Sequence, residues 1–239
     1  MNIVDIVYLI IRIVLSVGAG LLLGWGTPYV FNRIPAKWLC DYDEEPDKEM
    51  WGERIKKYPW SWVFAFLFLG AVFCIWHMGP IYQIAGLPAL WLLLLMALAD
   101  QKYMIIPDQL VVTLAVTAIG FVPFQPDFLS PLYGALIGGG SLLVIGTIGR
   151  WISKKDVMGF GDVKLMAAIG LISGMKGTVI ILVLTFLSAG VVMGFGLLSG
   201  RLKREEEQPL GPYIAAATTA FILFRPWFLL LADGYLAGF

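Results

Sequence analysis

The chain has 239 residues, of which 59% are hydrophobic and only 14% are charged, and its formal net charge at pH 7 is zero. A mean hydropathy of +0.82 with so little charge excludes an ordinary soluble domain. We therefore expect an all-α polytopic membrane protein, with the lipid bilayer as its surroundings and no nucleic acid among its partners.

Apolar runs predict about eight transmembrane helices, since a helix needs about 20 residues to cross about 30 Å of hydrocarbon. The first run has no small-residue cleavage site after it and is interpreted as a retained span. The short sixth run precedes Gly174-Met175-Lys176-Gly177, so it is expected to be tilted, partly re-entrant or extended into the preceding loop. Residues 1–239 are interpreted as one membrane-embedded bundle. The eight runs lie near 3–25, 60–78, 84–99, 106–123, 131–149, 164–174, 177–199 and 212–232.

One long polar segment, at about residues 26–59, separates the first two runs and is predicted to be a solvated loop. Lysine and arginine favour the cytoplasmic ends of spans. Of the 17 cations, 14 fall in this loop and in the alternate segments around Lys102, Arg150 and Arg201. The pattern predicts that this loop is cytoplasmic and that both termini lie outside.

Glycine pairs four residues apart predict close helix packing, because helices in lipid approach each other through small residues. The pairs are Gly20 with Gly24, Gly134 with Gly138, and Gly190 with Gly194.

Two aspartates at the ends of apolar runs are the candidate catalytic residues. Asp100 ends the third run and Asp162 begins the sixth, both on the predicted cytoplasmic face. A carboxylate in or beside the bilayer core costs roughly 3 kcal/mol on insertion scales, so it is retained mainly for function or for a paired partner. Two carboxylates that share one proton can hydrolyse a peptide bond, since the ionised one activates water and the protonated one polarises the carbonyl. Spacing alone does not bring the two together.

The residues around the two aspartates add candidate parts of a site. Gly159 and Gly161 permit unusual backbone angles and the close approach of a peptide, or else a tight turn at the start of a helix. Asp108 follows a proline at the start of the fourth run, where it can cap free backbone N–H groups. Lys164 can stabilise a carboxylate, or snorkel to lipid phosphate.

The sequence resembles a known family at four places. The Ala99–Asp108 segment and Gly159-Phe160-Gly161-Asp162-Val163-Lys164-Leu165 look like the two signatures of type IV prepilin peptidases, the GxGD membrane aspartyl proteases. Asn32-Arg33-Ile34-Pro35 and Pro209-Leu210-Gly211-Pro212-Tyr213-Ile214-Ala215 are similar to the segments after the first and before the last helix of bacterial members.

The resemblance implies a membrane aspartic endopeptidase with Asp100 and Asp162 as the catalytic pair and Gly159 and Gly161 in the active-site motif. Its substrates would be type IV prepilins or pseudopilins, whose short basic leader is cut, usually after glycine, at the cytoplasmic face of the inner membrane. Pilus or secretion machinery would be a further partner. Proteolysis by two carboxylates needs no cofactor.

Many bacterial members also methylate the new N-terminus and carry paired CxxC motifs for zinc in the first cytoplasmic loop. This chain has only Cys40 there, and a closed zinc site needs about four ligands, so no metal is expected. Methyltransfer stays open and would require S-adenosylmethionine.

Three other interpretations remain. Another GxGD intramembrane protease would share the second motif but not the spacing from Asp100 to Asp108. A proton-coupled transporter would use the same acids as proton carriers and would show inverted repeats, of which none is evident in the sequence. A scaffold of a pilus or secretion machine would tolerate asparagine at both positions.

Overall fold

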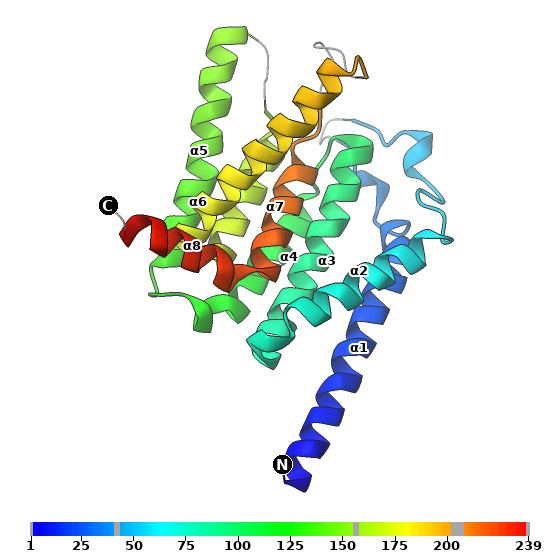
Figure 1. Ribbon diagram of the computed structural model, residues 1–239. Coiled ribbons are helices and arrows are strands. Elements are labelled where there is room, and N and C mark those ends of the chain that lie inside the picture. The colour runs from blue at the N-terminus through cyan, green and yellow to red at the C-terminus, as the bar shows by residue number, and fades with distance from the viewer. Residues whose placement is uncertain (1, 41–43, 155–157, 202–207, 238–239) are drawn as a thin grey trace. The chain divides into compact units, whose positions relative to one another are not determined.

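The computed structural model describes residues 2–40, 44–154, 158–201 and 208–237 (Figure 1). Within these ranges the chain forms eight α-helices and four short 3-10 helices, and no strand. This confirms the all-α prediction. The chain divides into two compact units, residues 1–91 and 92–239, and the helix α3 (Pro80–Tyr103) contributes to both.

The first unit is built on two helices, α1 (Ile3–Phe31) and α2 (Trp60–Cys74), which pack against each other. A Cβ atom on Gly24 would lie 2.4 Å from Ala65 Cα, and one on Gly20 would lie 3.0 Å from Val72 Cγ2. The first predicted glycine pair is therefore the place where α2 crosses α1. The 3-10 helix η3 (Trp76–Met78) then leads into α3.

The polar segment between α1 and α2 begins later than predicted, because α1 continues through Pro28 to Phe31, whose ring is fully buried. It contains η1 (Ala36–Trp38) and η2 (Lys48–Met50). It is also more ordered than a solvated loop. Arg54 is 8% exposed and donates hydrogen bonds to the carbonyls of Phe31 and Met50. Asp41 and Asp43 of this segment lie outside the described residues.

The second unit contains the rest of α3 and five further α-helices. They are α4 (Asp108–Thr117), extended by the 3-10 helix η4 (Ala118–Phe124), then α5 (Ser130–Ser153), α6 (Phe160–Leu198), α7 (Gly211–Leu223) and α8 (Arg225–Ala237).

Glycines hold α5 against α6, which run side by side (Figure 1). A Cβ atom on Gly170 would lie 2.3 Å from the carbonyl of Gly134, and one on Gly138 would lie 2.6 Å from the carbonyl oxygen of Met166. Backbones this close leave no room for a side chain. Gly190 and Gly194, by contrast, meet no described neighbour within 4 Å, so the third predicted pair does not pack here.

The predicted break between the sixth and seventh apolar runs is confirmed, because α6 is kinked at Gly174, where φ is +71° and the backbone is not helical. The sixth run extends into the preceding loop as far as Phe160, which is one of the predicted alternatives. The prediction of one last helix is wrong. The last run is split into α7 and α8, which meet at 89°. Pro226 lies in the first turn of α8, and a proline there lacks an N–H and clashes with the carbonyl four residues earlier, so α7 does not continue straight through it.

Four helices in the described ranges, α1, α3, α5 and α6, are long and apolar enough to cross a membrane, and the bent α7–α8 pair is a fifth if the two helices form one broken span. At about 1.5 Å per residue, the 15 residues of α2 reach only about 23 Å. The protein is thus a multi-pass helical membrane protein. The count of eight spans, the single bundle and the sides of the termini stay predictions.

Candidate active site

Asp100 lies near the end of α3, within the second unit, and is only 5% exposed. Its Oδ2 accepts a buried hydrogen bond of 2.8 Å from the backbone N–H of Gly211. Gly211 is the first residue of α7. The carboxylate therefore binds one of the free N–H groups that every helix presents at its N-terminus, and this contact fixes the direction of the side chain.

Gly211 is also in close contact with Asp100. A Cβ atom at this position would lie 2.6 Å from Asp100 Oδ2 and 3.0 Å from its Cγ. Only glycine lets the amide approach this carboxylate without displacing it. The sequence analysis identified the Pro209–Ala215 segment but gave Gly211 no role. The feature that could have pointed to Gly211 is a glycine next to a proline at the start of an apolar helix.

Asp162 lies in the first turn of α6 and is 8% exposed. Its backbone N–H donates to the carbonyl of Gly159, which is the residue before the helix. Its Oδ1 is buried and has no hydrogen-bond partner among the described residues. A buried carboxyl oxygen without a partner lowers the stability of the fold by about 1–3 kcal/mol, so stability does not explain an aspartate at this position.

The two motif segments pack against each other. A Cβ atom on Gly161 would lie 3.2 Å from Ile106 Cβ, so Gly161 lets the turn before α4 approach the start of α6. Asp100 and Asp162, one from each of these segments, are both buried within the second unit.

A salt bridge joins the same two segments at their margin. Lys164 Nζ lies 2.8 Å from Oδ1 and 2.7 Å from Oδ2 of Asp108, and both side chains are about one third exposed. Asp108 is the first residue of α4 and Lys164 lies in the first turns of α6. The sequence analysis treated the two residues separately, because residues 56 positions apart in the chain show no sequence pattern that predicts a salt bridge.

A cavity of about 490 Å³ lies beside the glycine motif in the second unit. Gly159 and Phe160 line it from the start of α6, and both are exposed. Its other lining residues include Leu142, Gly146 and Thr147 of α5. The cavity gives a ligand access to the backbone of Gly159.

In the part of the chain that the structure describes, no three His, Cys, Asp or Glu side chains gather so that they could hold a metal ion.

The fold and site define a polytopic helical membrane protein with two buried aspartates in one unit. Comparisons with known proteins give its family. Residues 87–195, which include both aspartates and both glycines of the motif, match the type IV leader peptidase family. The chain belongs to this family.

The relatives are bacterial. The chain is 32% identical to a prepilin leader peptidase/N-methyltransferase of Xanthomonas campestris pv. campestris over 70% of this chain and 60% of that protein. It is 34% identical to the protein of the same name in Pseudomonas aeruginosa, over 68% and 56% of the two chains. The leader peptidase HopD of Escherichia coli is 33% identical over 52% of this chain and 81% of its own length. The chain thus spans 60% or less of the first two relatives. No solved structure matches.

Proposed function

We propose that this protein is a membrane aspartic endopeptidase that removes the short basic leader from type IV prepilins or pseudopilins. The observation that carries the proposal is that Asp100 and Asp162, from two motif segments that pack together, are both buried within one unit of a membrane protein, with no described hydrogen-bond partner for Asp162 Oδ1. Membership of the type IV leader peptidase family supports the substrate class.

The pair would act as one acid–base unit with a single proton. The ionised carboxylate takes a proton from water as the water oxygen attacks the scissile carbonyl carbon, and the protonated carboxyl gives its proton to the carbonyl oxygen. Collapse of the tetrahedral intermediate breaks the C–N bond, and a proton passes to the leaving amine. The Gly211 N–H holds Asp100 in place throughout.

The cavity beside Gly159 is the proposed place for the peptide around the cut bond. The exposed glycine backbone can pair with an extended strand, whereas a helical substrate would shield its own carbonyls. The substrate's transmembrane segment would dock laterally, and its leader would stay in the cytoplasm. This places the site at the cytoplasmic face of the inner membrane, as the distribution of cations also favours. Machinery of a pilus or secretion system is the proposed setting.

Methylation of the new N-terminus is a second candidate activity, because two of the relatives carry N-methyltransferase in their names. It would need S-adenosylmethionine as donor, while leader cleavage needs none. The same experiment tests both activities.

The test is the intact mass of a prepilin with a basic leader ending in glycine, read before and after incubation with the reconstituted protein. Loss of the leader supports the proposal, and a further gain of one methyl group in the presence of S-adenosylmethionine supports the second activity. The control is a prepilin whose final leader glycine is replaced by a bulky residue. If several prepilins keep their leaders under conditions where the protein is folded, the proposal is wrong and the transporter and scaffold interpretations replace it.

A further inference from the structure

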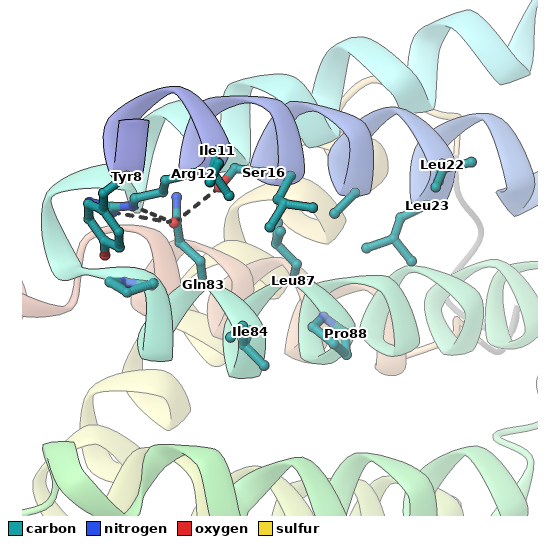
Figure 2. Close-up of a pocket in the computed structure, with 13 residues that line it drawn as sticks. Tyr8, Ile11, Arg12, Ser16, Leu22, Leu23, Gln83, Ile84, Leu87 and Pro88 are labelled. Carbon is teal, nitrogen blue, oxygen red and sulfur yellow. Dashed lines mark hydrogen bonds between the residues drawn. The ribbon is translucent and has the colours of Figure 1, made fainter. Parts of the chain in front are cut away.

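A long groove of about 580 Å³ runs between α1 and the first part of α3, both within the first unit (Figure 2). Its walls are mostly aliphatic. Arg12, Ser16 and Gln83 gather with Tyr8 at one end, while Leu22, Leu23 and Pro88 lie at the other (Figure 2). The groove therefore has a polar end and an apolar end, like an amphipathic molecule.

The polar end carries a positive charge that no carboxylate balances among the described contacts of Arg12. Its guanidinium donates to the carbonyl of Trp76 at 2.5 Å and to Gln83 Oε1 at 3.3 Å, and it stacks over the Trp76 ring at 4.0 Å. All these partners are uncharged. A cation in an apolar setting is stabilised by an anion, and the described side chains that contact Arg12 supply none.

Gln83 adds an unused donor to the same place. It is 3% exposed, and its Oε1 already accepts from Arg12 and from Ser16. Its Nε2 is buried and has no hydrogen-bond partner among the described residues. Buried amide N–H groups without partners are uncommon, and they mark places where an acceptor has to come from outside the chain.

Arg12 lies inside the first apolar run and 19 positions before Phe31, the last residue of α1. At about 1.5 Å per residue this is about 29 Å, close to the thickness of the hydrocarbon core, so a span that ends at Phe31 would put Arg12 at the opposite headgroup level. Trp76 and Tyr8 beside Arg12 are residue types that gather at that level.

The length of the groove matches one leaflet. From Arg12 to Leu23 is about 16 Å along α1, or about half of the hydrocarbon thickness. The groove is therefore long enough for one acyl chain.

We infer that this groove binds one anionic phospholipid. The phosphate lies between the Arg12 guanidinium and Gln83 Nε2, and an acyl chain follows the groove toward Leu22 and Leu23. The site is independent of the aspartate pair, so the proteolytic proposal neither supports nor weakens it.

Native mass spectrometry of the full-length protein, purified in mild detergent and supplied with phosphatidylglycerol, tests the inference. Arg12→Gln removes the charge and keeps hydrogen-bonding capacity, and Lys176→Gln removes a charge from an exposed salt bridge elsewhere as its control. Ala19→Phe fills the groove without touching Arg12. Val17→Phe is its control, because Val17 lies on the same helix, is 37% exposed and does not line the groove.

The wild type should keep one phosphatidylglycerol, with affinity lowered about tenfold or more by Arg12→Gln and by Ala19→Phe but unchanged by the two controls. Equal retention by all five proteins overturns the inference. Displacement of the lipid by inorganic phosphate alone contradicts the role of the groove, and displacement by a prepilin transmembrane peptide assigns the groove to that helix instead. Melting temperatures show which variants are folded. If Arg12→Gln is not folded, Ala19→Phe still tests the inference.

Discussion

Replacing Gly211 by alanine perturbs Asp100 with a single methyl group. The new Cβ atom would lie 2.6 Å from Asp100 Oδ2, whereas ordinary contacts begin near 3.4 Å, so the carboxylate has to withdraw by about 0.8 Å. A displacement of about 1 Å in a catalytic group costs about 10²-fold in rate, which corresponds to about 2.7 kcal/mol in the barrier. We therefore expect kcat for leader cleavage to fall about 10²-fold in Gly211→Ala, with KM little changed because the substrate contacts remain.

The assay is steady-state leader cleavage in detergent, with melting temperature and folded fraction measured on the same samples. Gly140→Ala is the matched control, because a Cβ atom at Gly140 meets nothing within 4 Å. A purely structural role for Gly211 would lower the folded fraction and leave kcat per folded molecule, and its pH profile, unchanged. A kcat within about threefold of wild type, in folded Gly211→Ala, would refute the positioning role.

Three further predictions follow from the second unit. Lys164→Met and Asp108→Asn should each lower the free energy of unfolding by up to about 1 kcal/mol, because the salt bridge between these residues is about one third exposed. In a double-mutant cycle, the variant with both substitutions should lose no more stability than either single variant. Gly170→Ala should destabilise the protein by about 1–3 kcal/mol or more, since its Cβ would lie 2.3 Å from the Gly134 carbonyl, and an unchanged melting temperature would contradict this. Thr147→Phe, which narrows the cavity beside the glycine motif, should raise KM for the prepilin with little change in melting temperature; an unchanged KM would show that the peptide binds elsewhere.

The fold class could be predicted from the sequence because long apolar runs in a membrane have to satisfy their backbone hydrogen bonds internally, which a helix does. The helix ends were harder. The glycine at 174 indicated the kink in α6, whereas the break at Phe224 divides into α7 and α8 what hydropathy presented as one span. Hydropathy averages over about a helical turn or more, and these breaks depend on one or two residues.

Of the candidate site, the sequence identified the residues but not their contacts. Asp100 and Asp162 were singled out by the cost of placing acids at apolar helix ends, and their burial in one unit depends on how the helices pack. The Gly211 contact with Asp100 spans 111 residues, and no local pattern encodes such a distance. Resemblance drew attention to the segment around Gly211, and only the structure shows its partner.

The most direct measurement of the central claim is the rate of leader removal by Asp100→Asn and Asp162→Asn, beside Asp127→Asn. Asp127 is exposed and accepts backbone hydrogen bonds at the start of α5, which asparagine can also accept, so this control should cleave like wild type. We expect each of the first two variants, at equal folded amounts, to lose at least about 10³-fold in rate. Undiminished cleavage by either of them would contradict a catalytic pair of aspartates.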